Sequence, residues 1–130
     1  MTGRAQDALP ERTGFLVVLA LGPTIWFAHF LVTYTTVAVA CGPRGPGEGA
    51  IRTVQWLVLA YTIAALIGIA AVALSGWGRH RHGSEAVPHD MDTPEDRHRF
   101  LGFAAFLLAM LSAVATLFVG GSTWLFPGCH

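Results

Sequence analysis

His29 is the side chain of this 130-residue chain best placed to do chemistry, because it is an imidazole inside a long stretch without charged residues. Counted from Trp26, the residues His29, Thr33 and Thr36 follow at three, seven and ten positions, which places all four on one helix face. Tyr34 lies on the adjacent face. An ionisable side chain within a membrane is a functional candidate by default. We therefore expect this polar stripe (Trp26, His29, Thr33, Thr36) to face protein and to contact a partner or a cofactor.

Three kinds of chemistry are open to His29. Its imidazole could ligate a haem iron, pass a proton near neutral pH, or hydrogen-bond a quinone or a partner helix. A haem held by two histidines of one chain is excluded, because no other histidine lies in the interior of an expected span and the first turn of the third helix, with His98, is expected to stand in water. The plainest interpretation is a neutral histidine that hydrogen-bonds a hydroxyl or carbonyl group and stabilises helix packing by about 0.6 kcal/mol.

Two cysteines, Cys41 and Cys129, follow the first and the last of the uncharged stretches. In an oxidising compartment two such cysteines predict a disulfide bond. The alternative is a copper or zinc site in which His130 adds an imidazole to the two thiolates. The chain has no closely spaced cysteine pair to support a metal, so we favour the disulfide.

A second group of histidines, His80, His82, His89 and His98, lies among acidic and basic residues near the middle of the chain. Their spacing matches no structural metal site. We interpret this segment as a solvated connector of mixed charge.

The elements that must position these side chains follow from the distribution of charge. Asp, Glu, Lys and Arg are absent from three long stretches, and 53% of all residues are hydrophobic while 12% are charged. Each stretch exceeds the roughly 20 apolar residues that cross a bilayer as a helix. The sequence predicts one membrane domain over residues 1–130, an all-α three-helix bundle. We expect the spans at about 15–40, 53–75 and 97–120, with a cytoplasmic loop at 76–96 and an outer loop at 42–52.

Local signals refine the spans. Pro23 follows Gly22 one-third of the way along the first span and should kink it. Thr93 and Pro94 predict the start of the third helix. Ala38 to Cys41 resembles a lipoprotein processing site, but the apolar run before it is about twice the usual 7–15 residues of a signal peptide, so we expect the first span to be kept.

Arginine placement predicts the orientation. Six arginines fall in the N-terminal tail and in the polar segment 76–99, which includes the start of the third helix, and two fall in the first loop. This asymmetry favours a cytoplasmic N-terminus and a periplasmic C-terminus.

Small residues at four-residue spacing predict where the helices pack, since they let helix backbones approach closely in lipid. One such ridge lies on the second span and another on the third. The six residues are Ala60, Ala64, Gly68, Ala105, Ala109 and Ala113. These ridges could hold the monomer together or meet another chain, including a second copy.

The stretch Gly22-Pro23-x-x-Trp26-x-x-His29-Phe30-x-x-x-Tyr34, followed by Cys41, resembles the first span of small three-span proteins associated with haem–copper cytochrome c oxidase genes in proteobacteria. The resemblance implies an accessory or structural subunit of a respiratory complex in the bacterial cytoplasmic (inner) membrane, in contact with lipid and larger membrane subunits. The alternatives are an assembly factor that handles copper through Cys41, Cys129 and His130 or haem through His29, and an oligomeric transporter or channel. We expect neither an enzyme nor a nucleic-acid-binding protein, because no catalytic set or basic surface is evident.

Overall fold

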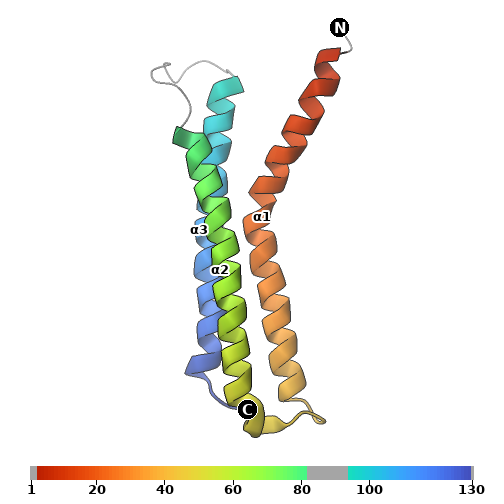
Figure 1. Cartoon of the computed structure of the whole chain (residues 1–130), viewed down its shortest axis with the longest axis vertical. Helices are drawn as coiled ribbons and strands as arrows, with labels where there is room; N and C mark the ends of the chain where they lie inside the picture. The colour runs from red at the N-terminus through yellow and green to blue at the C-terminus, as the bar shows by residue number, and fades with distance from the viewer. Residues whose placement is uncertain (1–2, 82–93, 130) are drawn as a thin grey trace.

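A computed structural model describes residues 3–81 and 94–129 of the chain. Three long helices make up the fold: α1 (Gly3–Ala40), α2 (Ile51–Arg81) and α3 (Pro94–Leu125). A short 3-10 helix, η1 (Gly47–Ala50), leads into α2. Figure 1 shows the three helices running along one long axis. The all-α three-helix prediction is therefore confirmed for the described ranges, which contain no strand.

The helices have the length and apolar character of membrane spans. Apolar segments at Thr13–Ala40, Gly47–Gly78 and Arg99–Leu125 have mean hydropathies of 2.1, 2.5 and 2.3. At most 33% of the residues in these spans are buried inside the bundle. Most of their apolar side chains therefore point outward, where lipid can cover them. The prediction of a multi-pass membrane protein is confirmed.

All three helices extend beyond the expected bounds of the spans, α1 at its start and the other two at both ends. α1 begins at Gly3, far before residue 15, and α2 runs from Ile51 to Arg81, so it continues past the expected end at residue 75. The third helix begins at Pro94, as the start signal predicts, and continues past Gly120 and Gly121 to Leu125. Hydropathy marks only the part of a helix that lipid surrounds, so it cannot report turns that continue into water.

The helices are arranged up, down and up, so α1 and α3 run in the same direction. α2 and α3 lie side by side, whereas α1 bends and its N-terminal part leans away from them (Figure 1). Pro23 is the expected cause, because it has no N–H to donate to the carbonyl of Leu19 and its ring pushes that carbonyl away.

The core of the bundle lies between α2 and α3. Ile69, Val72, Ala73 and Ala109 form one buried cluster, and side chains of α1, Ile25 among them, pack against it. In a bilayer such a core holds by close packing and not by exclusion of water, since the surrounding lipid is equally apolar.

A glycine lets α1 approach α3. A Cβ atom added at Gly22 would lie 3.2 Å from the Cα atom of Ala109 and 3.5 Å from Oγ of Ser112. Both atoms belong to the α3 packing surface, and Ala109 is fully buried. The ridge predicted on the third span thus lies largely within the bundle: Ala105 is also buried, and Ala113 packs against the core.

The ridge predicted on the second span takes little part in packing within the chain, so its contact with another chain, the other alternative, stays a prediction. Ala60 and Ala64 are exposed, and only Gly68 faces a neighbour, the side chain of Ile25. The small residues that α2 buries are instead Ala65, Ala73 and Gly76. Small residues occur on several faces of α2, so their spacing alone could not identify the packed face.

Candidate functional site

The centre of the polar site is a hydrogen bond between His29 of α1 and Thr62 of α2. The two residues lie equally far from the connection between their helices, which begins after Ala40 and ends before Ile51. An antiparallel pair therefore brings them to the same depth. His29 Nε2 and Thr62 Oγ1 are 3.0 Å apart, and the side chains are 5% and 7% exposed.

The neighbours of Thr62 determine which ring nitrogen of His29 carries the proton. Thr62 Oγ1 is 2.7 Å from the carbonyl oxygen of Val58, a separation that requires the hydroxyl proton to lie between the two oxygens. Thr62 must then accept from His29, so Nε2 carries the proton of the neutral ring. Nδ1 is consequently the bare, accepting nitrogen.

The remaining polar stripe divides between the inside and the outside of the bundle. Thr33 is buried and its hydroxyl lies 3.5 Å from His29 Nε2, at the limit of a hydrogen bond. Thr36 is half-buried and donates to Val32 of its own helix. Neither Trp26 Nε1 nor His29 Nδ1, both buried, has a hydrogen-bond partner among the described residues. The structure therefore brings His29 and Thr33 together within the chain and leaves two nitrogen atoms unsatisfied.

An aromatic row runs along α1 beside this stripe. The rings of Trp26 and Phe30 are 6.3 Å apart, and those of Phe30 and Tyr34 are 6.1 Å apart, both stacked. Tyr34 is 64% exposed. It therefore lies outside the His29 cluster, and much of its surface is open to the surroundings of the bundle.

Gly120 of α3 closes the space next to Thr62. A Cβ atom added at Gly120 would lie 2.5 Å from Thr62 Oγ1 and 3.0 Å from its Cγ2. No side chain other than hydrogen fits at this position without movement. Thr62 is thus held between His29 of α1 and the backbone of α3.

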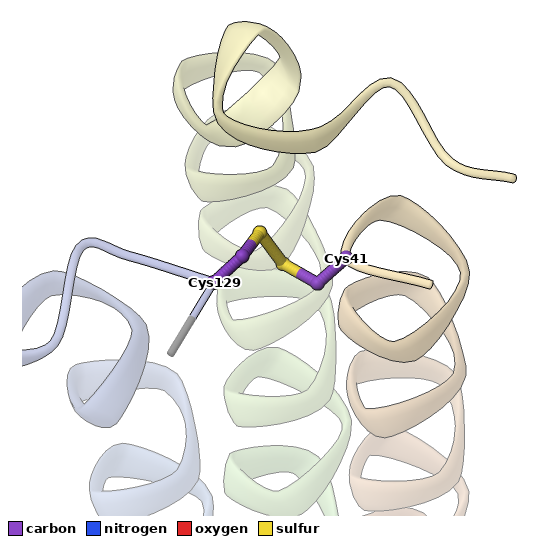
Figure 2. The surroundings of a disulfide bond; sticks show 2 residues. All are labelled: Cys41 and Cys129. Carbon is purple, nitrogen blue, oxygen red and sulfur yellow. A yellow bond between two sulfur atoms is a disulfide. The ribbon is translucent and has the colours of Figure 1, made fainter. Parts of the chain in front are cut away.

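The two cysteines form a disulfide bond, which confirms the preferred interpretation. Their Cα atoms are 5.3 Å apart although 88 positions separate them in the chain. Figure 2 shows the bond linking the tail that follows α3 to the end of α1. The bond fixes the relative positions of the first and third helices at this end of the bundle.

A cavity of about 340 Å³ lies between the helices at the disulfide end. Cys41 lines it together with residues of all three helices and of the C-terminal tail. Its walls include Phe30, Tyr34 and Phe126, and its hydrogen-bonding groups include Thr33, Gln55 and Thr123. Because Thr33 also approaches His29, the cavity adjoins the His29 cluster. Its volume is within the range of spaces that receive small molecules.

The described residues of the site provide few ligands for a metal ion. Both thiol groups are consumed by the disulfide, and the described residues contain no group of three or more His, Cys, Asp and Glu side chains able to hold a metal. His130 lies outside the described residues, as do His82 and His89. A haem iron would have to replace Thr62 at Nε2 or reach a buried Nδ1.

Sequence reasoning found His29 but missed its partner. Thr62 is a hydroxyl-bearing residue near the middle of the second span, and matching its depth with that of His29 would have identified it. Gln55 was missed as well: its Nε2 donates to the carbonyl oxygen of Thr123 at 3.2 Å and ties α2 to α3. Gln55 is the only Gln or Asn in the three spans, so its residue type was a signal available in the sequence.

Comparison with known proteins identifies no relative of this chain. No protein-family model matches the sequence, and searches of curated proteins and of solved structures find no match.

Proposed function

We propose that this protein is a non-catalytic accessory subunit of a larger membrane complex, and that it acts by packing its helices against those of a partner. The resemblance of residues 22–41 to oxidase-associated three-span proteins makes a respiratory oxidase of the bacterial cytoplasmic membrane the proposed partner. Its small size, with helices accounting for nearly all described residues, supports a role in contact and positioning.

The observation that carries this proposal is the exposure of Ala60 and Ala64 on α2. Small residues one turn apart are common where membrane helices approach closely, and here the chain itself does not use them. Lipid tails gain nothing from such a ridge, whereas a helix of another chain gains close backbone contact. The ridge is therefore the surface that we assign to the partner.

The proposed orientation has the N-terminus in the cytoplasm and the C-terminus in the periplasm. Six of the eight arginines support it, because they lie in the N-terminal tail and in the polar segment 76–99. The disulfide supports it too, because in this orientation Cys41 and Cys129 face the periplasm, an oxidising compartment in which such bonds persist.

The alternatives fit the geometry less well. Copper handling would need the reduced thiols of Cys41 and Cys129, which are joined here. Haem handling would need His29, whose Nε2 is engaged by Thr62. A pore built from several copies would need the polar stripe to face outward, whereas His29 and Thr33 are buried within one chain.

The test is purification of the tagged full-length chain from its own membranes in mild detergent, followed by mass spectrometry. We expect larger oxidase subunits in stoichiometric amounts. The paired change Ala60→Leu with Ala64→Leu should lower their recovery about tenfold, which corresponds to 1.4 kcal/mol of lost association energy.

The matched control is Ala70→Leu, which adds the same side chain at an exposed position on a neighbouring face of α2. It should leave the recovery unchanged. A chain that purifies alone, or a partner that is lost equally in both variants, would contradict the assignment of the ridge. Recovery of a membrane complex other than an oxidase would keep the contact surface and refute the oxidase identity.

A further inference from the structure

We propose that the cavity beside the disulfide binds a neutral, planar, oxygen-bearing ring compound that is dissolved in the membrane, of the quinone or quinol class. The inference does not depend on the accessory-subunit proposal, because it concerns a space inside one copy of the chain. The cavity volume of about 340 Å³ falls within the range of small-molecule sites.

The walls of the cavity select for a ring. Phe30 and Tyr34 form one stacked pair on α1, and Phe126 of the C-terminal tail adds a third aromatic side chain. Aromatic rings pack against one another in offset or edge-on arrangements, which stabilise the contact beyond the burial of their area. A flat ring can use these contacts more fully than a flexible chain can.

The charge of the cavity selects for a neutral ligand. Among the described residues that line it, none carries a charge. Transfer of an ionised group into such surroundings costs several kcal/mol unless an opposite charge meets it. Phosphate-bearing and carboxylate-bearing groups are therefore disfavoured.

Gln55 selects for oxygen at the edge of the ring. One N–H of its carboxamide donates to the Thr123 carbonyl oxygen, which leaves a second N–H and the Oε1 oxygen for a ligand. The N–H can donate to a quinone carbonyl, and Oε1 can accept from a quinol hydroxyl. Thr33 lines the same cavity and carries a hydroxyl group. A lipid acyl chain would cover these groups without forming a hydrogen bond to them, which is unfavourable.

The position of the cavity gives the ligand a route and an optical reporter. Its wall residues belong to the parts of the three spans next to the disulfide. A compound dissolved in the bilayer can therefore reach the cavity from the side, between the helices. Trp56 and Trp124 are the chain neighbours of Gln55 and Thr123, and their rings are 6.3 Å apart. A quinone bound in the cavity should quench the fluorescence of this pair.

The test is a fluorescence titration of the full-length, disulfide-bonded chain in lipid nanodiscs with decylubiquinone. We expect saturable quenching, and a competition experiment should show that decylbenzene, which has the ring and the tail but no oxygen, binds at least about tenfold more weakly. Val119→Phe, which fills the cavity, should weaken binding of decylubiquinone about tenfold or more. Val114→Phe makes the same change at an exposed position of α3 and should alter it less than about twofold.

Gln55→Leu provides a second variant in case Val119→Phe does not form the Cys41–Cys129 bond, which a non-reducing gel with thiol labelling reports. Quenching that does not saturate, or equal affinity in Gln55→Leu, Val114→Phe and the unchanged chain, would overturn the proposal. Equal binding of decylbenzene would assign the cavity to an apolar chain and equally overturn it. Loss of decylubiquinone binding in Gln55→Leu, with binding kept in Val114→Phe and the unchanged chain, would support the proposal.

Discussion

Replacement of Gly120 by alanine should weaken the bundle, because it adds an atom where α3 meets Thr62. The new Cβ would lie 2.5 Å from Thr62 Oγ1 and 3.0 Å from Cγ2, about 1 Å inside an ordinary contact. Thr62 has little freedom to turn away, because its branched side chain is restricted and its hydroxyl is bonded to both Val58 and His29. The helices must therefore separate, or the His29 bond must break.

The expected loss follows from these two outcomes. Inserting a methyl group into a packed interface costs about 1–3 kcal/mol. Loss of an interhelical hydrogen bond in a membrane adds about 0.6 kcal/mol. Alanine in place of glycine within a helix returns about 0.5–1 kcal/mol. The net expectation for Gly120→Ala is a loss of about 1–3 kcal/mol in the free energy of unfolding.

The adjacent glycine provides the control. A Cβ atom added at Gly121 would meet nothing within 4 Å, so Gly121→Ala should leave stability unchanged or raise it slightly. Both variants can be measured by titration with sodium dodecyl sulfate in mixed micelles, followed by circular dichroism with the disulfide intact. The additional change Thr62→Ser removes Cγ2 and should restore part of the loss in Gly120→Ala. Equal stability of the two alanine variants would refute the α2–α3 contact described above.

Two further predictions use the same titration. Thr62→Val leaves the Nε2–H of His29 buried without its acceptor and should lower the free energy of unfolding by about 0.6–1.7 kcal/mol. Thr62→Ser keeps the acceptor and should lower it clearly less. Equal losses in the two variants would mean that packing of the methyl group, and not the hydrogen bond, stabilises the bundle. Ala109→Leu should separate α1 from α3 and destabilise the bundle by about 1–3 kcal/mol. Ala64→Leu, at an exposed position, should change the free energy of unfolding by less than about 0.5 kcal/mol. Similar values for the two variants would refute the assignment of the packed faces.

The sequence was sufficient to predict the class of fold, because the removal of charge from three long stretches is a strong requirement of the bilayer. It also predicted the start of α3 at Pro94 and the pairing of Cys41 with Cys129. The start of α3 depends on a local sequence signal, and two cysteines can pair in only one way.

The packed faces could not be predicted in the same way. In a soluble helix the polar face reveals the buried one, but every face of α2 is apolar, so the pattern of Ala60, Ala64 and Gly68 competed with that of Ala65 and Ala73. The cavity was equally hidden, because it depends on where the tail with Phe126 folds back against α1. Such contacts arise from the joint packing of three helices and have no signature in any single one.

The bond between Cys41 and Cys129 turns α2, α3 and their flanking segments into a covalently closed loop. Closure requires both ends of the loop to be on one side of the bilayer, so the segment between them crosses it an even number of times. The bond can form only after α3 has been threaded through during biosynthesis. Oxidation of this pair is therefore a chemical record of completed insertion, and a chain stalled after its second crossing would be marked by a free thiol at Cys41.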